Sequence, residues 1–136
     1  TQAMNTDQVW FAQLESLVNQ AEVLLATPDS SIYSNCNVRN ILLSTYRFNV
    51  PVIGLSASYV NAGALAAIFA SPEQLAEQTA ATLQKFTAGQ SWTGGQYSST
   101  FSIALNPQIA RSLGINLLTD SALRLRMNEL SRGAHD

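Results

Sequence analysis

The stretch from Val50 to Ala67, VPVIGLSASYVNAGALAA, decides the fold. Its first four residues are too few and too β-branched for a helix, and an apolar run without alternation is typical of a strand buried on both faces, as in a parallel sheet. A loop of small and hydroxyl-bearing residues follows, and a second apolar run begins after Gly63. The stretch therefore predicts two buried strands joined by a short connection.

The same alternation of helix and strand extends over the rest of the chain. Helical spacing of apolar residues and short apolar runs mark the elements, although the alanines of residues 64–69 would also suit a helix. We expect helices at 7–21, 35–48, 71–88 and 106–114 and from about 119, strands at 23–26, 50–55, 64–69 and 100–105, and a disordered tail at 132–136.

The helix that begins after Ser71 has the clearest terminal signals. Ser71 and Gln74 are spaced as a capping box, Pro72 occupies the first helical position, and Glu73 places an acidic residue in the first turn. Gly89 is expected to end this helix near residue 88.

These elements predict one α/β domain over residues 1–136, with an open, mostly parallel sheet and helices on both faces. Charged residues make up only 12% of the chain, about half the usual share of roughly 25%. Such a chain is expected to bury part of its surface against another lobe or another chain. An isolated lobe would then expose that face, and we expect it either to form a homodimer or to be weakly stable.

The charge pattern excludes two classes of partner. The net charge is −2, and the seven basic residues are scattered, so there is no continuous basic surface for nucleic acid or anionic lipid. No apolar run reaches the roughly 20 residues needed to span a bilayer, and the first residues lack the basic start and the apolar stretch of a signal peptide. The start TQAMNTDQVW is typical of an interior cut, so we expect that a signal peptide or another domain can precede it. The single cysteine, Cys36, excludes an internal disulfide and a multi-cysteine zinc site.

Polar side chains follow the first two predicted strands where each strand ends. Asp29 and Tyr33 follow the first strand, and Ser56, Ser58 and Tyr59 follow the second. The carboxyl ends of parallel strands meet at the edge where α/β proteins bind ligands. The hydroxyls can form directional hydrogen bonds, the tyrosine rings offer stacking area, and the carboxylate can pair with a ligand cation or amine.

Each of these residues also has a structural interpretation. Asp29, Ser34 and Asn35 can cap helices or form Asx-turns, and both tyrosines can pack over the sheet edge. Cys36 is either a reactive thiol at a helix start or a half-buried small apolar residue. Trp92 is either a lid or interface anchor, or is buried under its own loop.

Signatures of catalysis are mostly missing, so no catalytic residue, metal site or cofactor is predicted. His135, the only histidine, lies in the expected tail, which leaves no positioned base for a Ser-His-Asp triad. The sequence from Gly54 to Ser58 begins like a nucleophile elbow but lacks its closing glycine. A hydrolase that uses Ser56 remains an alternative.

Several short segments together resemble uncharacterised ABC-transporter substrate-binding proteins related to tryptophan- and tyrosine-binding components. Their order and spacing agree over about 90 residues. The segments are Pro28–Ser30, Val50–Gly54, Val60, Gly63–Ala66, Asn106, Ala110 and Leu113–Ile115.

The resemblance implies a Rossmann-like lobe of the type I periplasmic-binding-protein kind, forming the second half of a two-lobed protein. It implies a periplasmic or extracytoplasmic location, a permease or signalling protein as partner, and ligand contacts at Asp29, Ser30, Ser56 and Ala57. Relatives commonly have an aspartate at the position of Ser56, so its absence disfavours an amino acid. Leu55 and Tyr59 favour a more apolar or aromatic pocket. The alternative function is an extracytoplasmic sensory or interaction domain.

Overall fold

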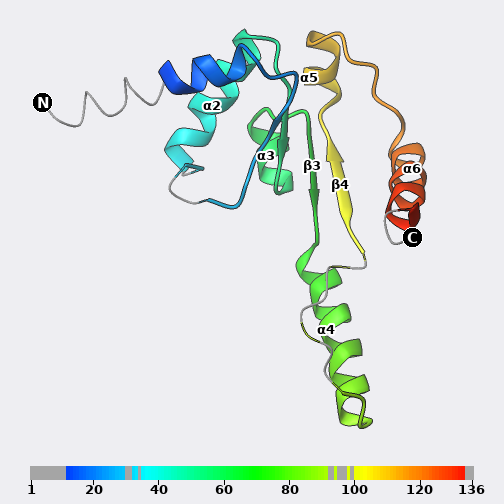
Figure 1. Cartoon of the computed structure of the whole chain (residues 1–136). Coiled ribbons are helices and arrows are strands. Elements are labelled where there is room, and N and C mark those ends of the chain that lie inside the picture. Colours follow the sequence, from blue (N-terminus) through cyan, green and yellow to red (C-terminus); the bar gives the residue numbers. More distant parts are fainter. Residues whose placement is uncertain are drawn as a thin grey trace, which may run out of the picture.

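The structure is a computed structural model that describes residues 12–29, 32–33, 35–91, 94, 98 and 100–133, and Figure 1 shows the arrangement of its elements. Residues 12–18 form a helix. The elements after it are β1 (Leu24–Leu25), α2 (Asn35–Arg47), β2 (Val52–Gly54), α3 (Ala57–Ala62), β3 (Ala66–Phe69), α4 (Pro72–Thr87), β4 (Ser102–Leu105), α5 (Pro107–Ser112) and α6 (Asp120–Gly133).

The four strands form one sheet in the order β1-β2-β3-β4. β2 is parallel to both of its neighbours, whereas β4 is antiparallel to β3. Parallel neighbours need a crossover connection, and α2 and α3 supply the two that this sheet requires. The predicted α/β fold with a mostly parallel sheet flanked by helices is confirmed.

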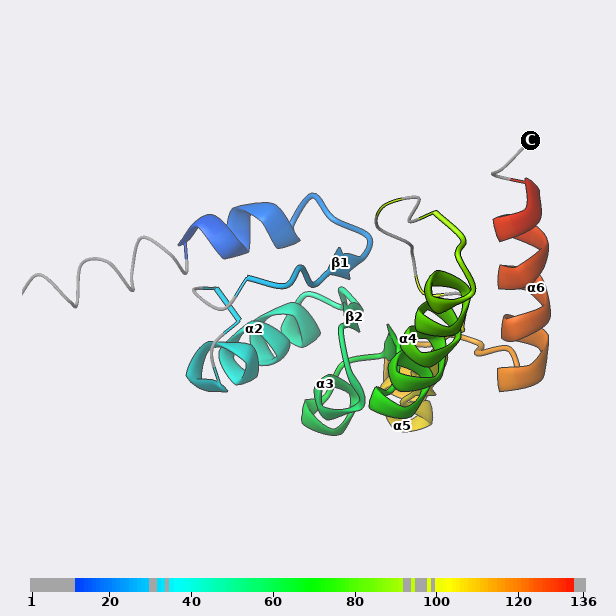
Figure 2. The ribbon, with the colours of Figure 1, turned by 90° about the horizontal axis from the view of Figure 1, so that it is seen from below.

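The core lies where α2 and α3 meet the sheet. These two helices contact each other, and α6 contacts β4, the strand at the other edge of the sheet. Figure 2 shows α2 and α3 on one side of the structure and α6 on the opposite side. Leu24 of β1 packs against both buried clusters of the core. The clusters are Leu14, Val18, Ile41 and Val50, and Leu42, Val52 and Ala64.

Both apolar runs of the Val50–Ala67 stretch form the predicted strands. Val52 and Ala67 are buried, and β2 and β3 pair through Ile53 with Ala66. Residues 66–69 of the alanine-rich run therefore form a strand and not a helix, because pairing on both edges outweighs the helix propensity of alanine.

The connection between β2 and β3 was predicted to be a loop, and that prediction is wrong. Residues 57–62 form helix α3, which contains Ala57, Ser58 and Tyr59. The backbone of Ser56 is extended, and Gly63, with φ of 120°, ends the helix. Parallel strands need a connection that returns over the face of the sheet, and this requirement turns a short polar segment into a helix.

The residues at the start of α4 form the predicted capping box. The Ser71 Oγ accepts from the Gln74 N–H at 3.2 Å, and the Gln74 side chain accepts from the Ser71 N–H at 2.8 Å. The helix ends at Thr87, and Gly89 adopts a positive φ of 85°. The sequence therefore encodes this helix locally.

The last two helices are also found where expected, although α6 reaches Gly133 and so includes residues 132 and 133 of the expected tail. Residues 134–136, including His135, lie outside the described residues, as do Ser30, Ser34, Trp92 and the side chains of Asn35 and Cys36.

Asn106 follows β4 and forms hydrogen bonds with both α3 and α5, so a substitution there is the best test of this arrangement. Its Oδ1 accepts from the N–H groups of Gln108 and Ile109, both at 3.1 Å, and its Nδ2 donates to the Val60 carbonyl at 3.1 Å. We expect Asn106→Ala to lower the free energy of unfolding by about 1–2 kcal/mol, since a cap and a tertiary hydrogen bond are lost. Urea unfolding measures this loss.

Asn106→Asp is the matched control, because the carboxylate keeps the cap of α5 and loses only the donor to Val60. It should cost less than the alanine variant. A loss below about 0.5 kcal/mol for Asn106→Ala would contradict a capping role of usual strength.

Candidate functional site

The candidate site lies at the edge of the sheet where β1 and β2 end. Because these strands are parallel neighbours, with Leu24 opposite Val52 and Leu25 opposite Ile53, the segments that follow them leave at the same edge. The centroids of the Tyr33 and Tyr59 rings are 6.2 Å apart, with the ring planes tilted by 56°. The structure therefore brings together one predicted aromatic residue from each strand end.

A tight turn returns Tyr33 toward the sheet. The Asp29 N–H donates to the Thr27 carbonyl, and the Tyr33 N–H donates to the Asp29 carbonyl, both at 2.8 Å. The turn leaves Asp29 exposed, while Tyr33 is half-buried and packs against the cluster that contains Leu14 and Ile41. Tyr33 thus has the packing role that was one of its two interpretations from the sequence, and its ring also lies beside that of Tyr59.

Ser56 and Ser58 form a pair of hydroxyls at the start of α3. Their Oγ atoms are 2.6 Å apart, and the side chain of Ser56 does not cap the helix. Ala57 lies between them and is exposed. Since neither serine hydroxyl is needed by the helix backbone here, the pair can offer a donor and an acceptor to a ligand.

Gly54 allows Tyr59 to lie directly against the end of β2. A Cβ atom at residue 54 would lie 2.3 Å from the Cβ of Tyr59 and 2.7 Å from its Cγ. Tyr59 is partly buried and packs on the cluster that contains Leu42 and Val52. The position of its ring is therefore fixed by the absence of a side chain at residue 54.

Burial raises the pKa of the Tyr33 phenol above its ordinary value of 10.0. Desolvation is the largest cause, the nearby Tyr59 adds to it, and a backbone hydrogen bond with Thr27 opposes it. Tyr33 is therefore a neutral hydrogen-bonding group at physiological pH.

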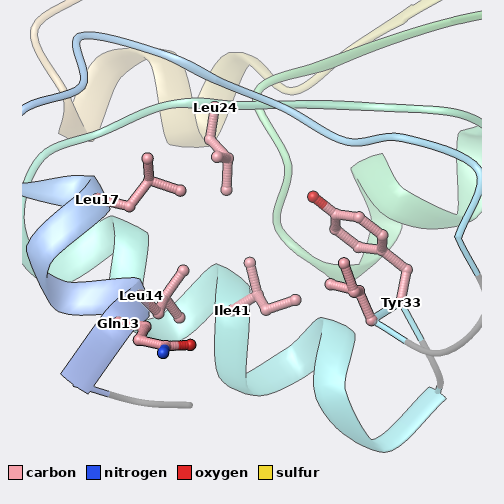
Figure 3. A pocket seen from close by; sticks show the side chains of 7 residues that line it. Gln13, Leu14, Leu17, Leu24, Tyr33 and Ile41 are labelled. Atoms are coloured by element: carbon pink, nitrogen blue, oxygen red, sulfur yellow. The ribbon is translucent and has the colours of Figure 1, made fainter. Parts of the chain in front are cut away.

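A cavity of about 220 Å³ lies behind Tyr33, between the helix at 12–18, β1 and α2. Figure 3 shows the Tyr33 ring and leucine side chains around this space. Its lining is formed by Gln13, Leu14, Leu17, Leu24, Ile32, Tyr33 and Ile41. Five of the seven lining residues are aliphatic, and an apolar cavity of about 150 Å³ already holds a benzene ring.

Two polar residues at the same sheet edge did not stand out as site residues in the sequence. Gln74 was recognised only as a helix cap, and Ser102 was not recognised at all, yet the Ser102 Oγ donates to the Gln74 Oε1 at 3.3 Å. The antiparallel register places Ser102 opposite Phe69. No local signal in the sequence specifies that pairing.

The site offers neutral hydroxyls, two aromatic rings and one carboxylate. In the described parts of the chain no group of three or more His, Cys, Asp and Glu side chains could hold a metal ion. Among the described helices, none is both long and apolar enough to cross a bilayer.

Comparison with known proteins supports the fold. No protein-family model and no curated protein sequence matches this chain. Among solved structures, a conserved domain protein from Vibrio cholerae matches with a TM-score of 0.56 and 22% identity, over 77% of this chain and 36% of that one. The ABC domain in complex with L-Trp from Streptococcus pneumonia matches with a TM-score of 0.56 and 19% identity, over 83% and 38%.

These matches show that the chain has the fold of a part of such proteins, and that it spans little more than a third of their length. The resemblance found in the sequence is thus supported at the level of a periplasmic-binding-like fold.

Gly54→Ala tests the contact that positions Tyr59. We expect the variant to lose about 1–3 kcal/mol of unfolding free energy, since the added methyl group forces the strand end and α3 apart. Chemical denaturation gives the loss. A variant as stable as the wild type would mean that α3 moves freely relative to β2.

The Tyr33 phenol predicts a pH dependence of stability. Because the folded state favours the neutral form, the unfolded chain releases this proton first, so the contribution of Tyr33 is complete below about pH 10 and is lost as the pH rises through the raised value. Tyr33→Phe should flatten the fall of unfolding free energy that begins as the pH rises above about 10. Tyr46→Phe, at an exposed position on α2, is the control, and equal pH curves for both variants would contradict the assignment.

Proposed function

We propose that this chain belongs to the solute-binding component of an ABC-type transport system. In this proposal a small, aromatic or partly apolar molecule binds at the shared edge of β1 and β2 and is enclosed there by a second lobe. Closure of the two lobes would report the bound state to a permease, which places the protein in the periplasm or another extracytoplasmic space.

The observation that carries this proposal is the pairing of Tyr33 and Tyr59 at the carboxyl edge of two parallel strands. Rings at a centroid distance of 6.2 Å, held by separate core clusters, form a preorganised aromatic surface. A planar ligand can stack on such a surface without a large loss of side-chain entropy.

The polar groups beside the rings support a ligand with few charges. Ser56 and Ser58 supply neutral hydrogen-bonding groups, and Asp29 is the one carboxylate among the predicted site residues. Carboxylates are the usual partners of amines, so Asp29 is the residue that would contact a ligand amine. Ser30 and Ala57 complete the proposed contacts, and no catalytic role is proposed for any of these residues.

The solved ABC domain from Streptococcus pneumonia was captured with L-Trp, which supports an aromatic ligand for this fold. The identity of 19% gives no support for tryptophan itself. The serine at position 56 argues instead for an aromatic molecule that lacks the α-amino group.

A thermal-shift screen of the full-length protein tests the proposal. The panel pairs L-tryptophan with indole and L-tyrosine with 4-methylphenol, and adds nucleobases and small organic acids. A ligand at a hundredfold excess over its dissociation constant stabilises the folded state by about 2.7 kcal/mol. We expect stabilisation by an aromatic compound, with the amine-free member of its pair at least equally effective.

Conservative variants then locate the ligand identified in the screen. Ser56→Ala and Tyr59→Phe each remove one hydroxyl at the site and should weaken binding about tenfold, corresponding to about 1.4 kcal/mol. Tyr46→Phe removes a hydroxyl from the exposed face of α2 and should leave the affinity unchanged; calorimetry measures all three. If all three variants bind the ligand with equal affinity, the ligand binds elsewhere. If no compound of the panel stabilises the protein, the result favours a sensory or interaction domain.

A further inference from the structure

The cavity behind Tyr33 is separate from the strand ends at which the proposed ligand binds. Its lining residues come from the helix at 12–18, β1, the segment before α2 and α2 itself. Among the predicted site residues that the structure describes, only Tyr33 lines this cavity. The serine pair and Tyr59, which follow β2, belong to the other place. The cavity is therefore a second location in which a molecule can bind.

This cavity combines a buried wall with an exposed apolar rim. Leu14 and Ile41 are buried, whereas Leu17 is 53% exposed and Ile32 is 39% exposed. Figure 3 shows Leu14 and Ile41 close together, on the helix at 12–18 and on α2. An apolar molecule can enter past the exposed rim, and the buried wall then removes most of its surface from water.

The size of the cavity suits a single substituted ring. Its volume is about 220 Å³, whereas a cavity of about 150 Å³ already holds benzene. The additional space accommodates about one or two substituents on a six-membered ring.

The lining disfavours a charged ligand. The described lining residues carry no carboxylate, ammonium or guanidinium group, and the only titratable one is Tyr33, whose phenol is neutral at physiological pH. An ionised ligand would lose hydration without gaining an opposite charge.

Gln13 supplies the second polar group of the lining. Its amide can both donate and accept a hydrogen bond, and Figure 3 shows it across the space from the Tyr33 ring. Gln13 is exposed, so its amide lies at the side of the cavity that water reaches. The lining thus fits an apolar ring whose one polar substituent points toward Gln13.

We propose that this cavity is a second binding site, which takes an uncharged molecule with one six-membered ring and one hydrogen-bonding substituent such as a hydroxyl. Aliphatic side chains enclose the ring, and the Gln13 amide bonds the substituent. The site lies within this lobe and needs no second lobe to complete it. It therefore goes beyond the proposed function and does not depend on it.

Three compounds that differ in one substituent test the proposal. Toluene, 4-methylphenol and 4-methylbenzoate are titrated into the full-length protein with labelled leucine methyl groups, observed by NMR. We expect 4-methylphenol to shift the methyl signals of Leu14, Leu17 and Leu24 and to give nuclear Overhauser effects between them and its ring protons. The exposed Leu118 and Leu125 should not respond. Toluene should bind about threefold or more weakly, and 4-methylbenzoate should not bind.

Two variants and a matched control then test the lining. Leu17→Ala removes part of the rim and should weaken binding of toluene and 4-methylphenol about fivefold or more. Leu43→Ala, at a similarly exposed position of α2 that does not line the cavity, should leave both affinities unchanged. Gln13→Met keeps the length of the side chain without the amide. It should weaken 4-methylphenol about threefold to tenfold and leave toluene within about twofold.

Four results would overturn the proposal. They are unchanged signals of the cavity leucines, equal effects of Leu17→Ala and Leu43→Ala, binding of 4-methylbenzoate as tight as that of 4-methylphenol, and leucine shifts that grow with protein concentration in the absence of ligand. The last result would mean that a second copy of the chain covers the rim.

Ser56→Ala separates this inference from the proposed function. If 4-methylphenol binds at the cavity leucines and no compound of the panel binds in a way that Ser56→Ala weakens, the second site stands and the proposed function fails. If every bound compound is weakened by Ser56→Ala and the cavity leucines do not respond, the proposed function stands and the second site is overturned.

Discussion

The parallel pairing of β2 with both of its neighbours is the constraint on which the rest of this structure depends. It requires a crossover on each side of β2, and α2 and α3 meet that requirement while burying Leu42, Val52 and Ala64 between them and the sheet. It also brings the ends of β1 and β2 to a single edge. The same pairing therefore builds the core and positions the candidate site.

The packing of the core determines where the side chains of the candidate site lie. Gly54 permits α3 to begin immediately after the strand, so that Tyr59 lies against the strand end, and the turn at Thr27–Tyr33 brings the second tyrosine back toward the same edge. Both rings thus pack against the buried clusters of the core. Binding groups that are held by the core in this way are preorganised, which reduces the entropy lost when a ligand binds.

The antiparallel strand β4 gives the structure its second distinct feature. A third parallel crossover would have returned α4 over the face of the sheet, as α2 and α3 do. The chain instead extends beyond the edge as α4 and comes back along β3, and the Ser71–Gln74–Ser102 cluster fixes the place of departure and return.

The elements that are marked by short-range sequence patterns could be predicted from the sequence alone. The apolar runs at 50–53 and 64–69 and the capping box of α4 are short-range patterns. The runs contribute the strands β2 and β3, and the capping box forms as predicted. The residues at the ends of β1 and β2 could be assigned to one edge because all parallel sheets share that property. Only the tertiary structure decided that residues 57–62 form a helix, that β4 runs antiparallel, and that Ser102 meets Gln74. Those features depend on strand pairing between residues far apart in the chain. The free energy of such pairing cannot be inferred from any short segment of the sequence.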